Sequence, residues 1–87
     1  MKQECYYQVN LTNQEERIYR VVDVNVQRLV TEFDMFGNKL DVAFIDYSEP
    51  SEVEHPFDFI EAWLADRDLE LDTFGDIEPE LVPYFFK

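Results

Sequence analysis

Polar and apolar positions alternate along the first part of the chain. Between residues 5 and 12 the odd positions carry Cys, Tyr, Val and Leu, and the even positions carry Tyr, Gln, Asn and Thr. A period of two with aromatic and β-branched residues predicts a half-buried strand. Residues 12–16 are all polar, and they predict the turn that ends this strand.

The alternation resumes from Arg17 to Phe33, where the even positions are mostly valine and the central odd positions are polar. We therefore expect a second strand whose even face, from Ile18 to Val30, is buried and whose odd face is wet. Its seventeen residues would span roughly 55 Å at about 3.3 Å each, which is too long for a domain of this size. A bulge or a sharp bend near one end is expected.

A Gly-Asn pair at residues 37–38 indicates a hairpin connection to a third strand, Leu40 to Tyr47. Both faces of this strand are partly apolar, with Leu, Val and Phe on one and Ala, Ile and Tyr on the other. Two apolar faces are typical of a central strand. The alternative is that the C-terminal tail or a partner covers the second face.

The hydrophobic period lengthens after Pro56, a residue that is favoured in the first turn of a helix. A helix from about Phe57 to Asp68 gathers its large apolar residues, including Trp63, in one arc and most of its acids in the opposite arc. Residues 69–72 alternate again and favour a further short strand.

Two prolines exclude a long helix in residues 73–87, and the run from Leu81 to Phe86 is too apolar for a free tail. We expect this run to pack on the sheet or against another chain. The predicted fold is α+β: a three-stranded antiparallel β-meander with one amphipathic helix packed on it and an irregular aromatic C-terminal tail. Residues 1–87 are expected to form a single compact acidic domain.

Charge changes this picture more than the rest of the composition does. Twenty Asp and Glu oppose seven Lys and Arg, and residues 41–87 hold −12 of the net charge of −13. This balance argues against direct binding to nucleic acid or to an anionic membrane surface, because both need basic residues. With no apolar run of about 18 residues, no signal peptide and a single cysteine, a cytoplasmic location is expected.

The residue types that enzymes use are scarce. His55 precedes a proline at the expected helix entrance and is interpreted as a capping or surface residue, and Cys5 as a buried, inert thiol. No glycine-rich phosphate loop, nucleophile motif or Cys/His metal spacing is present. The alternating acids of residues 66–72 fail the calcium-loop template at its turn glycine and at its final glutamate. We therefore expect no enzymatic activity, no cofactor and no metal.

The acids instead indicate binding to a basic protein. Carboxylates pair with arginine much as phosphates do, so an acidic surface can occupy the nucleic-acid site of a nuclease, a CRISPR effector or a DNA-binding protein. The nine expected binding residues, with those of the helix first, are Asp58, Glu61, Asp66, Asp68, Glu70, Asp72, Asp76, Glu78 and Glu80. The aromatic residues that could serve as anchors among them are Tyr47, Trp63, Tyr84, Phe85 and Phe86.

In size, charge and strand–strand–strand–helix layout the chain resembles the small acidic inhibitors that phages and plasmids use against host nucleases, including some anti-CRISPR proteins. It also resembles nuclease immunity proteins. The leading hypothesis is a non-enzymatic inhibitor that blocks a basic nucleic-acid-binding surface by charge mimicry. One alternative is that the acids serve ordinary solubility. Another is an interaction or homo-oligomerisation module, possible as a homodimer through strand 40–47 and tail 81–86, whose acidity is incidental.

Overall fold

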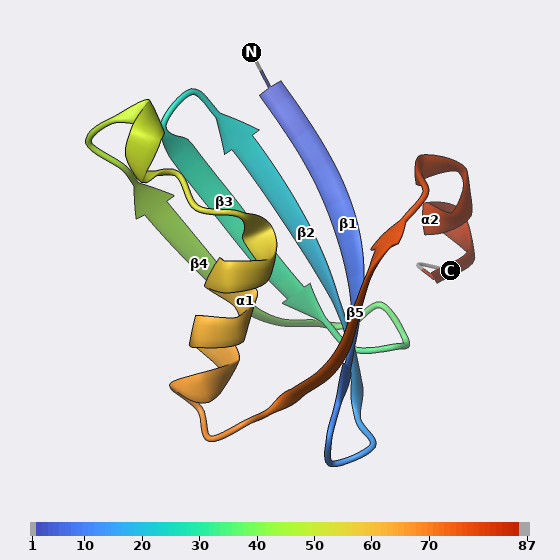
Figure 1. The fold of residues 1–87 in the computed structure, drawn as a ribbon. Helices are drawn as coiled ribbons and strands as arrows, with labels where there is room; N and C mark the ends of the chain where they lie inside the picture. Colours follow the sequence, from blue (N-terminus) through green and yellow to red (C-terminus); the bar gives the residue numbers. More distant parts are fainter. Residues whose placement is uncertain (1, 86–87) are drawn as a thin grey trace.

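The computed structural model describes residues 2–85, without the side chain of Phe85, and shows a five-stranded antiparallel sheet (Figure 1). The strands are β1 (Lys2–Leu11), β2 (Glu16–Val24), β3 (Gln27–Phe33), β4 (Lys39–Asp46) and β5 (Leu71–Ile77). They lie in the order β4-β3-β2-β1-β5. The first four strands therefore form a meander, and β5 returns to pair with the free side of β1.

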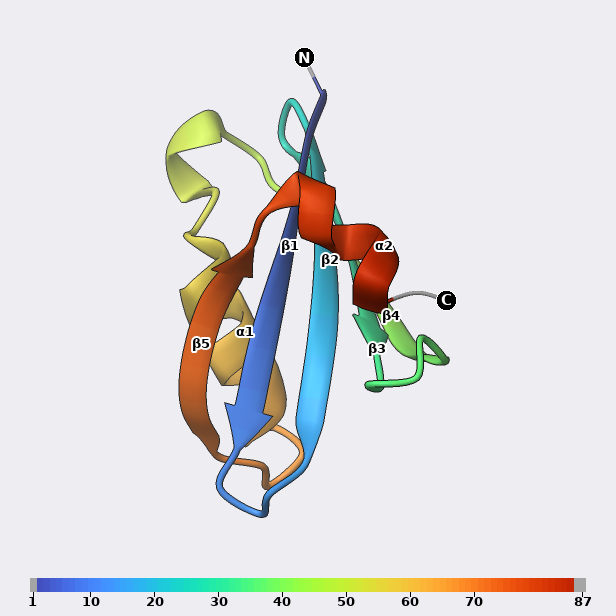
Figure 2. The same cartoon turned by 90° about the vertical axis from the view of Figure 1, so that its right-hand side faces the viewer.

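The helix α1 (Pro56–Ala65) lies across one face of the sheet, which we call the helix face (Figures 1 and 2). A 3-10 turn, η1 (Pro50–Glu52), precedes it. A second turn, η2 (Pro79–Leu81), and the short helix α2 (Val82–Phe85) follow β5 on the opposite face, which we call the open face (Figure 2). Within residues 2–85 no helix has both the length and the apolar content needed to cross a membrane.

The hydrophobic core lies between α1 and the helix face. Ile60 and Leu64 of α1 are completely buried there. The strand residues that they join in the core are Tyr7, Val9, Leu11, Tyr19, Val21 and Val30. Burying a side chain of this kind contributes about 2 kcal/mol. The burial of Ile60 and Leu64 therefore fixes the orientation of α1, and the opposite face of the helix is left in solvent.

The ends of α1 follow from local hydrogen bonds. The Nδ1 atom of His55 accepts a hydrogen bond from the N–H of Phe57 at 3.0 Å, which confirms the predicted capping role. The helix ends before residue 68 because Asp68 adopts a left-handed φ of 59°. The N–H of Leu69 then donates to the carbonyl of Leu64 at 2.9 Å, which closes the last turn.

The predicted three-stranded meander is wrong, because residues 17–33 form two strands and not one. A two-residue turn at Asn25 and Val26 separates β2 from β3, and Val24 pairs with Gln27 across it. Asn25 has a φ of 56°, a left-handed conformation that asparagine adopts more readily than most residues. A single strand would have been too long, and the chain avoids this length by reversing near the middle of the stretch. The expected bend was near one end.

The reversal also changes which residues share a face. Tyr19 and Val21, on the odd face that was expected to be wet, are buried in the core under α1. The even residues Arg28 and Val30 pair with β2 so that they lie on the same helix face, whereas Ile18 lies on the open face. All three are buried as predicted, but they lie on two faces of the sheet and not on one, and the odd residues beside them are not wet.

The third predicted strand exists as β4, but it lies at the edge of the sheet and not at its centre. Its open-face residues Leu40, Val42 and Phe44 are 47%, 42% and 62% exposed. The described part of the tail does not cover them, because η2 and α2 lie beyond β1, at the far side of the sheet from β4 (Figure 1).

The C-terminal quarter is more regular than expected. The short strand expected at residues 69–72 is β5, which extends to Ile77 and pairs with β1. The segment after it forms η2 and α2, although the sequence predicted an irregular tail. The side chain of Phe85 and the whole of Phe86, both predicted as anchors, lie outside the described residues.

Candidate protein-binding surface

All nine carboxylates predicted to bind a partner are exposed. Asp58 and Glu61 lie on the outer face of α1, opposite the buried residues of that helix. Asp66 and Asp68 follow the helix and do not belong to it, which corrects the prediction that they lie on its outer face. The other five follow the chain through β5 to η2.

The fold gathers some of the nine carboxylates and separates others. Glu61, Asp68 and Glu70 line one hollow of about 370 Å³. Asp72 lines a second hollow, of about 220 Å³, together with Glu16 of β2. The carboxylates that line none of the hollows described here are Asp58, Asp66 and Glu80. The surface therefore consists of several small, separate groups of acidic residues and not of one cluster.

Arg28 and Arg67 pair with other carboxylates and so do not neutralise this surface. The guanidinium of Arg28 donates to both oxygens of Asp23 at 2.7 and 3.1 Å. Arg67 donates to both oxygens of Glu32 at 2.9 and 2.6 Å. Apart from Asp23, Glu32 and Asp34, every acidic residue of the protein is exposed. In the part of the chain that the structure describes, none of the nine carboxylates forms an ion pair.

The buried carboxylate of Glu32 is a feature that the sequence analysis missed. It is 1% exposed and accepts hydrogen bonds from Arg67 and from the hydroxyl of Tyr19, at 2.5 Å, while Arg17 lies 4.0 Å away. Burial alone would raise the pKa of Glu32, but these hydrogen bonds and the two positive charges outweigh burial and lower it. The one signal in the sequence was Arg67 itself, the only cation between residues 41 and 86.

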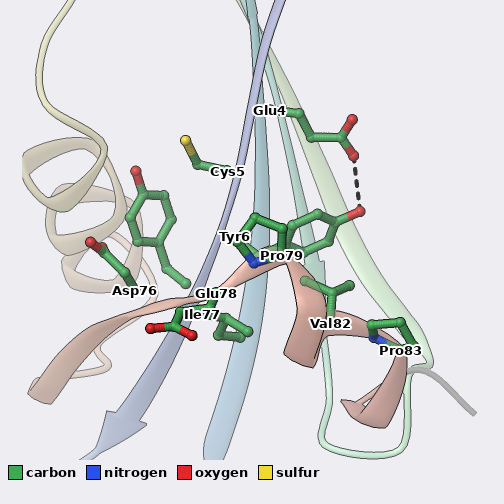
Figure 3. A pocket seen from close by; sticks show the side chains of 10 residues that line it. Glu4, Cys5, Tyr6, Asp76, Ile77, Glu78, Pro79, Val82 and Pro83 are labelled. Atoms are coloured by element: carbon green, nitrogen blue, oxygen red, sulfur yellow. Dashed lines mark hydrogen bonds between the residues drawn. The ribbon is translucent and has the colours of Figure 1, made fainter.

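A further hollow, of about 590 Å³, opens where β5 ends (Figure 3). Ile77, the last residue of β5, pairs with Tyr6, so β1 continues past the end of its neighbour. The residues that line the hollow come from β1, from the end of β5 and from η2 with α2: Glu4, Cys5, Tyr6, Tyr7, Asp76, Ile77, Glu78, Pro79, Val82 and Pro83. No local sequence pattern indicates this hollow, because the hollow depends on the pairing of β5 with β1.

The hollow combines apolar walls with acidic groups. The hydroxyl of Tyr6 donates to the carboxylate of Glu4 at 2.9 Å, which fixes the tyrosine ring beside Val82 (Figure 3). Glu4, Asp76 and Glu78 are all exposed. Such a hollow suits a lysine or arginine side chain, whose methylene stem packs on apolar surface while its charged end pairs with carboxylates.

The predicted aromatic anchors do not all face solvent. The Trp63 ring lies under the guanidinium of Arg67, with 4.8 Å between them, and packs against the core. The Tyr47 ring lies 5.8 Å from the guanidinium of Arg28 and is half-buried. Tyr84 is 71% exposed, and it is therefore the one described anchor that is available to a partner.

In residues 2–85 no group of three or more His, Cys, Asp or Glu side chains is arranged to hold a metal ion. Cys5 is a free thiol and is half-buried, where the sequence analysis expected a buried one. No protein-family model matches the chain, and neither a curated protein nor a solved structure matches it. The functional proposal therefore rests on the surface of the protein itself.

Proposed function

We propose that this protein is a non-enzymatic inhibitor that binds the basic, nucleic-acid-binding surface of another protein in the cytoplasm. The observation that carries the proposal is that the nine carboxylates, from Asp58 to Glu80, are all exposed and lie outside the ion pairs of the described chain. Arg28 and Arg67 bind Asp23 and Glu32 instead. The acids therefore remain available to the arginines and lysines of a partner.

Charge mimicry explains how such a surface inhibits. A carboxylate accepts two parallel hydrogen bonds from a guanidinium, as a phosphate does, so a site built for phosphates also binds carboxylates. A net charge of −13 attracts a basic partner over a long range and speeds the encounter. We assign the part of the hollow beside Asp76 and Glu78 to one arginine or lysine of that partner.

Neutralising the acids at α1 and after it tests the proposal. We expect the combined variant Asp58→Asn, Glu61→Gln, Asp66→Asn and Asp68→Asn to fold normally, because these side chains are exposed. Loss of several pairs with a basic surface should weaken binding by well over tenfold, at about 1 kcal/mol or more for each desolvated pair. The measurement is affinity capture from a bacterial lysate at about 0.15 M salt, with elution by a salt gradient and identification by mass spectrometry.

The matched control removes the same charge from another part of the surface. Asp46, Glu49, Glu52 and Glu54 are exposed, lie outside the ion pairs and belong to β4 and the segment between β4 and α1. Their neutralised variant should retain the same partner. If the two variants release the partner at the same salt concentration, net charge alone is responsible, and the assignment to the nine carboxylates is wrong.

A further inference from the structure

The open face of the sheet ends in an apolar edge. Leu40, Val42 and Phe44, which we call the β4 stripe, alternate along β4 and are between 42% and 62% exposed. Because β4 pairs with β3 on one side only, the other side of its backbone has no neighbouring strand in residues 2–85. An edge strand with an exposed apolar face is a template for pairing with another strand.

The two edges of this sheet differ in how they resist such pairing. β5 carries Asp72 and Asp76, contains Gly75 and is irregular opposite Asn10 and Leu11. Charges and bulges of this kind keep other strands away. β4 has one such shift near its start, where Leu40 is left without a partner on β3, but it pairs regularly from Asp41 to Asp46 and carries no charge between these two residues. β4 is therefore the edge at which a further strand fits.

We propose that a second copy of this chain occupies the β4 edge, with the two β4 strands antiparallel and the two sheets joined into one of ten strands. A pairing of identical strands about a two-fold axis is closed, so it stops at a dimer. It pairs the free backbone groups of both edges, and it buries the β4 stripe of one copy beside that of the other.

The pattern of side chains selects one register. Residues on the same face meet when Val42 of one copy lies opposite Val42 of the other, which places Leu40 opposite Phe44. On the helix face this register sets Asp41 opposite Ala43. A shift that centres the pair on Asp41 would place two like charges face to face, and the shift that centres it on Ala43 would set Leu40 against Asp46.

Charge also favours a second copy over a basic partner at this edge. Residues 1–40, which include β1 to β3, contribute −1 to the net charge of −13, and β4 itself adds only Lys39, Asp41 and Asp46. The β4 stripe lies on the open face, whereas α1 with Asp58 and Glu61 lies on the helix face (Figure 2). Two copies can therefore pair at β4 without bringing their acidic surfaces into contact.

The dimer and the proposed inhibitor complex respond to salt in opposite directions. Two copies of charge −13 repel each other through solvent, and salt removes that repulsion as the Debye length falls from about 30 Å at 0.01 M to about 3 Å at 1 M. Raising the salt concentration should thus strengthen the dimer and weaken binding to a basic partner. The dimer does not depend on the inhibitor function, and either proposal can fail alone.

The test is the mass of the full chain in solution, measured by size-exclusion chromatography with light scattering at low and high salt. The wild type is expected to shift from the monomer mass of 10.5 kDa toward twice that mass as salt and protein concentration rise. Val42→Lys should remain a monomer, because it sets a charge at the centre of the pairing. A wild type that stays monomeric at high salt would overturn the proposal.

Val24→Lys is the matched control. Val24 is also a valine on the open face, 38% exposed against 42% for Val42, but it lies on the interior strand β2. This variant should dimerise like the wild type. If it dissociates the dimer as Val42→Lys does, the open faces stack on each other, and edge pairing is wrong.

Hydrogen exchange on the wild type gives a second measurement that needs no variant. The amides of residues 40–45 should exchange more slowly under conditions that favour the dimer, while those of β5 are unchanged. Equal slowing along both edges, or no slowing at β4, would contradict the proposed interface.

Discussion

At the scale of single residues, Arg67 has a role that the charge pattern concealed. It is the only cation of the segment from residue 41 to residue 86, and it binds the buried Glu32 on β3 with both of its terminal nitrogens. Its guanidinium also covers the ring of Trp63. The positive charge of Arg67 weakens an acidic binding surface. Its role is instead structural, because it holds the end of α1 on the sheet.

Replacing Arg67 tests this role through pH. Arg67→Ala leaves Glu32 buried with Tyr19 as its remaining close donor, and about 3 kcal/mol of unfolding free energy should be lost at neutral pH, the lower end for a buried pair because Arg67 is partly in water. The pKa of Glu32 is lowered in the wild type. Its contribution is therefore present above the unfolded pKa of about 4.3 and is lost as the pH falls through the folded pKa.

The measurement is urea unfolding of the wild type and Arg67→Ala at several pH values. The difference between them should be largest near pH 7 and should shrink below about pH 4 as Glu32 takes up a proton in both proteins. Lys39→Ala removes the same charge from an exposed site and should cost little at any pH. A difference that does not depend on pH would show that Arg67 acts through packing on Trp63 alone.

At the scale of elements, the turn between β2 and β3 decides the fold. It reverses the chain within two residues, and it puts Tyr19 and Val30 under the same helix. Nothing in the alternation of residues 17–33 marks it, because a two-residue turn does not interrupt a pattern of period two. Asn25 alone supplies the left-handed backbone that the turn requires.

Substitutions at Asn25 test the importance of that conformation. Asn25→Val should lower the unfolding free energy by about 1–2 kcal/mol, because a β-branched residue is strained at a left-handed φ. Asn25→Gly should leave stability nearly unchanged, since glycine adopts this region freely. Equal stabilities of the two variants in urea unfolding would mean that the backbone at this turn is not what limits the hairpin.

Local patterns predicted local structure well and strand pairing badly. The first strand, the bounds of the third predicted strand and the capped start of α1 at His55 all follow from neighbours in the sequence. The position of β5 beside β1 does not, because it depends on contacts between residues that lie sixty or more positions apart. The central place predicted for β4 failed for the same reason: two apolar faces do not reveal which strands flank them.

The candidate surface was likewise predictable only where it depends on local sequence. Exposure of Asp58 and Glu61 follows from the helical arc that they share, since the opposite arc is apolar. The grouping of acids around hollows does not, because Glu4 joins Asp76 and Glu78 only through the pairing of β1 with β5. Sequence patterns therefore predicted the exposure of these acids but not how the fold groups them.

At the scale of the whole molecule, the protein separates its charges by depth. The arginine pairs of Arg28 and Arg67 lie against the core, and all but three of the acidic residues are exposed. Mutual repulsion of these acids costs folding stability, and a protein of this size remains soluble with far fewer of them, at a net charge of magnitude about 2–8. The cost is accounted for if the exposed acids bind a basic partner.

The measurement that tests this claim most directly is competition with nucleic acid. The partner retained by the immobilised protein at about 0.15 M salt is challenged with a DNA duplex or a single-stranded RNA, and in parallel with the same ionic strength of NaCl. The account predicts that one basic protein is released by nucleic acid and not by the matched salt, because both ligands occupy one site. A partner that remains bound at saturating nucleic acid, or a set of basic proteins that all leave at low salt, would contradict it.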